Sequence, residues 1–255
     1  MSRRRALLAG WVLALAVAAL FASLGRWQLA RMHEKQAMLS ASAQVLQRRA
    51  PQPLLLASDP ARAGGYDWAA GSGRLANATV WLDNQQRDGR SGVRMYCVLL
   101  PDQGAQALLV DAGWWPLDGS RTLPVFGCPA RDAQPVRGLL APPPSAGLAH
   151  GDALAPAGQG RWLATRLETA AVASALRLPT GLAPRVLRLD PERAAGDAGV
   201  MLAPGQRDLD ILPNTLSPER HLGYAVQWFG LALTVLAVAA VLTFRRKEKS
   251  ADGRA

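Results

Sequence analysis

Three residues around the start of the second apolar run of the chain are suited to bind a haem. His221, Tyr224 and Trp228 fall on nearly the same side of a helix, because offsets of three and seven residues return to similar angles. His221 would lie about 7 Å along that helix from Val226, the first residue of the run. A ring nitrogen at this boundary, with aromatic rings beside it, can ligate the iron of a haem that lies partly in lipid. The same residues also fit an aromatic belt with a hydrated histidine.

The rest of the chain carries no comparable chemical signal. His33 and His150 have no Cys, His or carboxylate neighbours at a metal-ligand spacing, so we expect both to be solvated. Asp208 and Asp210 lie in a loop, where solvated surface roles are expected. The GxSxG, HExxH and glycine-rich phosphate motifs are missing from the sequence. We therefore predict that the protein has no catalytic residues and is not an enzyme.

Two apolar runs place His221, Tyr224 and Trp228 relative to a membrane. Ala6 to Leu24 and Val226 to Phe244 contain 19 residues each without a charge, long enough to cross a hydrocarbon core of roughly 30 Å as a helix. Basic residues precede the first run and follow the second, which predicts cytoplasmic termini and an outer middle segment. A cleaved signal peptide is the alternative for the first run. Because its apolar stretch exceeds the usual length of about 7–15 residues, we expect an uncleaved anchor.

The net charge of +10 comes mainly from the ends of the chain. Outside residues 25–222 there are 8 Lys and Arg against 2 acidic residues, and within this segment 21 against 17, so the ends supply +6 and the middle +4. Basic flanks of this kind are favoured beside anionic lipid headgroups on the cytoplasmic side. We therefore expect contacts with membrane lipid and no nucleic acid partner.

The middle of the chain reads as short strands separated by turn residues. The candidates are residues 78–83, 93–100, 106–111, 136–141 and 185–190. An antiparallel sheet or a small barrel would bury such strands. One helix is expected at 166–176 and an exposed loop at 142–160. The predicted fold class is an α+β membrane protein, with two transmembrane helices flanking a mostly antiparallel β extracytoplasmic domain.

The predicted boundaries follow from these elements. The segment after the first run has helix formers and either prolongs the first helix or restarts it. Ser217-Pro218 is suited to begin the second helix, because Ser is an N-cap residue and Pro fits the first helical position. The expected parts are a cytoplasmic N-terminus (1–5), transmembrane helix 1 (6–24), a helical extension (25–50), a β-rich periplasmic domain (51–216), a helix with transmembrane span 2 (217–244) and a basic cytoplasmic tail (245–255).

Two cysteines lie in the middle segment. Cys97 and Cys128 are 31 residues apart without CxxC spacing, which makes metal or redox chemistry a weak inference. An outer compartment would permit a disulfide. Their apolar surroundings favour two small core residues over a structural bridge.

Four segments resemble the surfeit locus protein 1 family, whose members assist assembly of cytochrome c oxidase. They are LGRWQ at 24–28, VWLDNQ at 80–85, LVDAGWWP at 109–116 and HLGYAVQWF at 221–229. Their order and the two-span layout also match, so the resemblance covers nearly the whole chain. It implies a multi-pass, non-enzymatic assembly factor of the bacterial inner membrane, with its main domain in the periplasm and both termini in the cytoplasm.

The resemblance also implies a cofactor and partners. Family members in bacteria look like haem a binding proteins that pass the cofactor to oxidase subunit I or stabilise it for that subunit. The implied partners are subunit I and other assembly factors. The family's haem-ligating histidine falls on His221, and Trp27 and Gln28 would either line the same cleft or pack the helices. The expected cofactor-binding residues are His221, Tyr224, Gln227, Trp228, Trp27 and Gln28. The alternative function is a scaffold that holds oxidase subunits together without binding haem.

The chain departs from the family pattern in two loops. The family usually has Asn-Arg-Gly-Trp where this chain has Asp-Ala-Gly-Trp at 111–114, and Asp-Asn-Arg where it has Asp-Asn-Gln at 83–85. The missing arginines put in doubt a role for these loops in holding haem propionates. Arg87, Arg90 and Arg94 lie near enough in sequence to substitute, so we expect arginines of the outer domain to meet the propionates.

Overall fold

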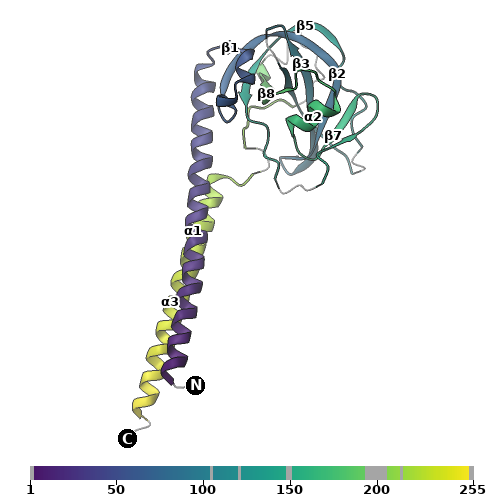
Figure 1. The fold of residues 1–255 in the computed structure, drawn as a ribbon. Coiled ribbons are helices and arrows are strands. Elements are labelled where there is room, and N and C mark those ends of the chain that lie inside the picture. Colours follow the sequence, from purple (N-terminus) through teal and green to yellow (C-terminus); the bar gives the residue numbers. More distant parts are fainter. Residues whose placement is uncertain are drawn as a thin grey trace. The chain divides into compact units, whose positions relative to one another are not determined.

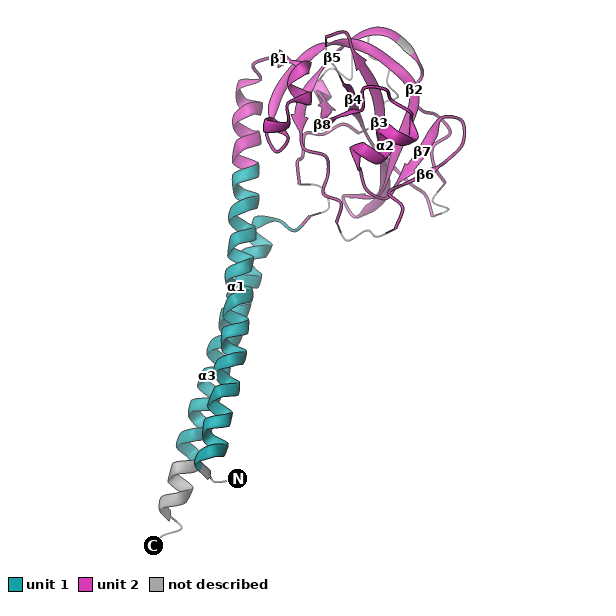
Figure 2. Ribbon diagram, viewed as in Figure 1, with its two compact units in different colours: residues 1–38, 216–255 teal, residues 39–215 magenta. Residues whose placement is uncertain are grey.

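The protein folds as two compact units. The computed structural model describes residues 3–103, 106–119, 122–147, 151–192, 206–212 and 215–252. One unit consists of Met1–Met38 and Leu216–Ala255, and the other of Leu39–Thr215 (Figure 2). We call them the helix pair and the outer domain. Long apolar helices at both ends of the chain and a mostly antiparallel sheet between them confirm the predicted fold class (Figure 1).

Two helices, α1 (Arg3–Arg48) and α3 (Pro218–Asp252), are long and apolar enough to cross a membrane. α1 continues without a break from the first apolar run into the segment that follows it. α3 begins directly after Ser217, whose carbonyl oxygen accepts a hydrogen bond from the His221 N–H at 3.2 Å. Proline at the first position of α3 leaves no helical hydrogen bond unmade.

In the helix pair, α1 and α3 run antiparallel. Trp11 contacts Thr243 near one end, and Gln28 contacts His221 near the other. The buried residues of α1 recur at spacings of three, four or seven, as Ala14, Ala18, Gly25, Gln28, Met32 and Lys35. This heptad spacing keeps one stripe of each helix facing its partner, as in a left-handed coiled coil.

A glycine sets the distance between the two helices at the middle of the pair. A Cβ atom on Gly25 would lie 2.8 Å from the ring of Phe229, well inside van der Waals contact. Small residues at such crossings let membrane helices approach closely, because dispersion contacts replace the missing hydrophobic driving force. Gly25 lies in the LGRWQ segment and Phe229 in the HLGYAVQWF segment. These two segments therefore meet each other.

The outer domain is built on a sheet that closes on itself. Its strands are β1 (Gln52–Pro53), β2 (Asp67–Arg87), β3 (Arg90–Pro101), β4 (Ala107–Pro116), β5 (Arg131–Ala141), β6 (Leu154–Pro156), β7 (Arg161–Ala164) and β8 (Leu182–Leu189). The ladder runs β3-β4-β8-β5-β2, and β2 pairs with β3 again, which closes a barrel. β7 and β6 extend from β2. Each of the five predicted strands overlaps an observed one, and the expected loop at 142–160 contains β6.

β2 joins the most neighbours because it is long and bent. It pairs with β5 along its first half and with β3 along its second, with irregularities between Leu75 and Thr79 and between Leu82 and Gln85. Such bulges bend a strand and let a sheet close. Asp88 and Gly89, with φ of 49° and 74°, form the two-residue turn into β3. Asp-Gly suits this turn because both positions need positive φ.

The sheet is buried on both faces. Residues such as Trp81, Leu108 and Leu187 belong to one core cluster, and their sequence neighbours such as Val80 and Leu109 belong to another. Alternation follows from the two-residue period of a strand. The second cluster is covered by β7 and by the short helix α2 (Thr169–Ala175), which lies within the predicted helix at 166–176. The 3₁₀ turns at Leu54–Ser58 and Pro60–Arg62 connect β1 to β2.

Candidate functional site

The strongest candidate site is the polar pair formed by His221 of α3 and Gln28 of α1. His221 Nδ1 lies 2.6 Å from Gln28 Oε1. Both residues are buried, at 6% and 9% exposure, in the stripe where the two helices meet. An amide oxygen only accepts hydrogen bonds, so Nδ1 carries the hydrogen and donates it. The other ring nitrogen, Nε2, is then unprotonated and keeps its lone pair.

This arrangement fits the chemistry of an iron-ligating histidine. Histidines that bind a metal through one ring nitrogen usually donate the other N–H to an acceptor, which fixes the tautomer and the ring orientation. Gln28 Oε1 supplies that acceptor here. Nε2 has no hydrogen-bond partner within the described parts of the chain. The hydrogen bond also pairs one polar atom of each side chain at a helix contact next to the apolar run, where an unpaired polar atom is costly.

The other predicted cofactor residues are only partly brought together. The rings of Trp228 and Phe21 pack with their centroids 5.5 Å apart, so Trp228 faces the neighbouring helix. Trp27 and Tyr224 are 54% and 42% exposed, and Gln227 is also exposed. Among the six predicted residues, Gln28 and His221 alone make a hydrogen bond to each other in the described structure. His221 and Tyr224, which were predicted to share one helical face, therefore differ in exposure: His221 is buried and Tyr224 is exposed.

The remaining histidines give no second site. His33 is exposed on α1. His150 lies outside the described residues. Within the described residues, no group of three or more His, Cys, Asp or Glu side chains is placed to hold a metal ion.

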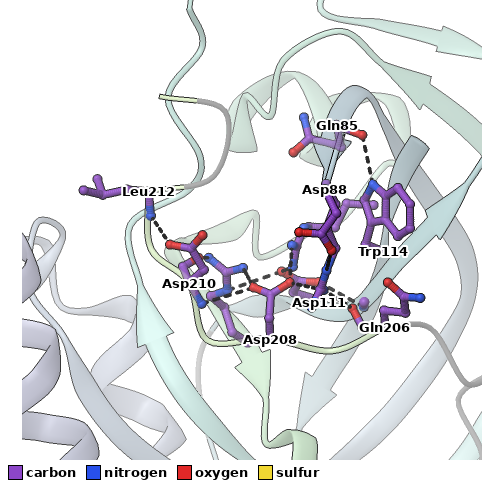
Figure 3. A network of polar contacts seen from close by, with 12 residues as sticks. Gln85, Asp88, Asp111, Trp114, Gln206, Asp208, Asp210 and Leu212 are labelled. Atoms are coloured by element: carbon purple, nitrogen blue, oxygen red, sulfur yellow. Dashed lines mark hydrogen bonds and ion pairs between the residues drawn. The ribbon is translucent and has the colours of Figure 1, made fainter. Parts of the chain in front are cut away.

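A second polar cluster lies in the outer domain, where residues 206–212 contact β2, β3, β4 and β8. Asp208 accepts hydrogen bonds from Arg87, Arg94 and Arg188 at 2.7–2.8 Å (Figure 3). Arg94 also donates to Asp111 at 2.9 Å. We call these five residues the arginine cluster. Asp208 is only 17% exposed, so the prediction of a solvated role for it is wrong.

Backbone contacts attach the same segment to β4. Trp114 and Gln206 exchange two backbone hydrogen bonds, of 3.0 and 2.9 Å. The Trp114 indole N–H donates to the Gln85 carbonyl at 2.9 Å (Figure 3). Asp111 Oδ1 accepts from the Gly113 N–H, and Gly113 has φ of 123°, which favours glycine. Residues 83–85 and 111–114, which depart from the family pattern, were expected to be loops but belong to β2 and β4, and both contact this segment or its neighbours.

The charges of the arginine cluster stabilise one another. Burial alone would raise the pKa of Asp208, but the charges of Arg94, Arg188 and Arg87 outweigh it and lower that pKa. Burial alone would lower the pKa of Arg94, and Asp111 and Asp208 more than compensate. Arg87 and Arg94, two of the arginines expected to meet haem propionates, are therefore already paired with carboxylates. Arg90 is exposed on β3.

The two cysteines form a disulfide in the outer domain. Cys97 and Cys128 are joined with a Cα–Cα distance of 5.6 Å, and both are buried. The preference for two unpaired core residues was therefore wrong. The bridge ties β3 to the segment before β5, and the Cys128 N–H also donates to Thr79 Oγ1 on β2 at 2.7 Å. Sequence spacing gave no signal for this pairing, because the two cysteines are 31 residues apart and are brought together by the tertiary fold.

Two apolar helices of membrane-spanning length, with one folded barrel domain between them in the chain, indicate a membrane protein. The chain belongs to the SURF1 family, whose pattern matches residues 15–233. This membership points to cytochrome oxidase assembly and confirms the predicted resemblance. SURF1 family assembly factors are non-enzymatic, which confirms the prediction that the protein is not an enzyme. A search among curated proteins found no match.

Proposed function

We propose that the protein binds or stabilises haem a for insertion into subunit I of cytochrome c oxidase, with His221 as the iron ligand. Family membership supports the oxidase assembly context. The haem step rests on one observation, the hydrogen bond that leaves His221 Nε2 free. The proposal places the protein in a bacterial inner membrane, with the outer domain in the periplasm and both termini in the cytoplasm. Its partners there are subunit I and other assembly factors.

Each residue of the helix pair has a distinct role in this proposal. His221 Nε2 holds the iron, and Gln28 keeps the imidazole in the required tautomer and orientation. Trp27, Tyr224 and Gln227 are exposed, which leaves their side chains available to contact a porphyrin. Bound there, haem a would supply an iron that imidazole can ligate and a largely apolar ring for these side chains to contact. A single protein ligand at the helix boundary suits temporary binding, because release breaks only one bond to the iron.

The test uses the full chain, purified in detergent after co-expression with a haem a pathway. A pyridine haemochrome spectrum should show haem a in the wild type and its loss in His221→Ala. His33→Ala is the matched control, since His33 is an exposed histidine on the same helix pair. Gln28→Leu should weaken haem binding by about 10–100-fold, because it removes the group that orients the ligand. A full haem load in His221→Ala would refute the assignment.

A scaffold without haem is the second candidate. His221 is 6% exposed and hydrogen-bonded across the helix contact, which is also what a purely structural residue would show. A scaffold predicts no haem in the wild type. It also predicts that oxidase levels in cells tolerate His221→Ala but fall when exposed residues of the outer domain are changed. The spectrum and the oxidase level together separate the two functions.

A further inference from the structure

We propose that the helix pair binds one anionic phospholipid, with its acyl chain in an apolar groove between α1 and α3 and its phosphate held by Arg4, Arg5 and Arg245. The groove lies toward the ends of the chain, on the opposite end of the helix pair from His221. The proposal is independent of haem binding.

The groove is large enough for a lipid chain. It encloses about 660 Å³ and is lined by residues between Ala6 and Val17 of α1 and between Thr234 and Thr243 of α3. Sites for small ligands typically measure roughly 300–1,000 Å³. All of its lining lies within the two apolar runs, so the groove faces the hydrocarbon core of a membrane.

The polar side-chain atoms in the groove are already paired. The Trp11 indole N–H donates to Thr243 Oγ1 at 3.1 Å. The Thr243 and Thr234 hydroxyls each donate to a backbone carbonyl of α3 at 2.8 Å. The wall therefore offers no unpaired donor to a polar ligand. It presents hydrocarbon, which fits an acyl chain.

Positive charge gathers at the same end of the pair. Arg4 and Arg5 directly precede Ala6, and Arg245 follows Thr243 by two residues, so all three flank the lining of the groove. All three are exposed, and none makes an ion pair with another described residue. Guanidinium groups bind phosphate through paired hydrogen bonds. An apolar groove beside such a cluster matches a phosphate-bearing lipid, whereas a partner helix would need no cations at this position.

A groove-filling variant tests the acyl-chain part. A Cβ atom on Gly10, which lines the groove, meets no atom within 4 Å. Gly10→Phe should therefore fill the groove without separating the helices. Leu8→Phe is the matched control, because Leu8 is 67% exposed and does not line the groove. The full chain is placed in nanodiscs that contain phosphatidylglycerol and phosphatidylcholine, and the lipids it retains are counted by native mass spectrometry.

We expect the wild type and Leu8→Phe to retain one phosphatidylglycerol and Gly10→Phe to lose it. The triple variant Arg4→Gln, Arg5→Gln and Arg245→Gln should retain a lipid without headgroup preference. A phosphatidylglycerol with a photoreactive acyl chain should label peptides of residues 6–17 or 234–243 in the wild type. Unchanged retention in Gly10→Phe, or labelling elsewhere on the helices, overturns the proposal. So does displacement of the lipid by a co-purifying membrane helix, which would make the groove a protein interface.

Discussion

The helix pair and the outer domain bury polar groups in opposite ways. In the outer domain, Arg87, Arg94 and Arg188 are paired with Asp111 and Asp208, and the cysteines are joined to each other. In the helix pair, one neutral hydrogen bond joins Gln28 to His221 and leaves a ring nitrogen without a partner. A cluster in which every arginine is paired with an aspartate stabilises a fold. An imidazole nitrogen that carries a lone pair and makes no hydrogen bond is chemically suited to bind a metal.

With the proposed function, this comparison makes the outer domain the source of stability and the helix pair the proposed place of haem binding. Variants of the arginine cluster should therefore change unfolding and leave the helix contact intact. Variants of the helix contact should change haem binding and leave the outer domain folded. A variant of one unit that changed the stability or haem binding of the other would contradict this separation.

Asp208→Ala should have the largest effect. It leaves Arg94 and Arg188, which are buried, without one of their carboxylate partners. Breaking a buried ion pair by removing one partner costs about 3–5 kcal/mol. Urea unfolding of the full chain in detergent, followed by tryptophan fluorescence, measures the loss. Asp210→Ala is the control, because within the described residues its side chain accepts a hydrogen bond from the Leu212 N–H and pairs with no arginine. Equal losses in the two variants would contradict a special role for the cluster.

Replacing both cysteines by alanine should have the next largest effect. Loss of a bridge that closes a loop of this length typically costs about 2–4 kcal/mol. The same urea titration should show the destabilisation, while protease protection in membranes should show both apolar helices still inserted. Alkylation of the wild type in cells under non-reducing conditions tests the compartment. Cys97 and Cys128 should resist the alkylating reagent, because a domain that folds where disulfides form has no free thiols. Free thiols in cells would contradict the periplasmic placement.

Gly25→Leu should act on the helix pair alone. The added side chain collides with the ring of Phe229, and overpacking of this kind costs about 1–3 kcal/mol. Separation of the helices should weaken the hydrogen bond between Gln28 and His221, so the haem load should fall while the urea midpoint of the outer domain stays unchanged. Gly230→Leu is the control, since a Cβ there meets no atom within 4 Å. A shift in the urea midpoint would show that the two units are coupled.

The smallest expected effect is the pH dependence contributed by Asp208. Its pKa is lowered in the folded protein, so its contribution to stability is fully present above the unfolded value of about 3.9. That contribution is lost as the pH falls through the folded value. Urea midpoints measured from neutral pH into the acid range should therefore fall less steeply in Asp208→Asn than in the wild type. If the urea midpoints of the wild type and Asp208→Asn fell equally with pH, Asp208 would not be the group responsible for the acid sensitivity.

The sequence predicted the elements more accurately than their contacts. Turn residues separated the predicted strands, because the φ angles that a tight turn requires, as at Asp88 and Gly89, are a local property. The strands predicted between such turns overlap β2, β3, β4, β5 and β8. Asp208 was misjudged because its partners are 20 to 121 residues away along the chain. No local pattern marks an aspartate that three distant arginines will surround.

The sequence by itself determined the two membrane-length helices, the strand-rich middle, the family and His221 as the candidate ligand. These follow from hydropathy, from turn chemistry and from short motifs, which are local along the chain. Only the tertiary structure decided that Gln28 binds His221, that Cys97 pairs with Cys128, and that Asp208 is enclosed by arginines. These contacts depend on the register of two antiparallel helices and on the closure of a barrel. Both are set by packing between segments that the sequence keeps far apart.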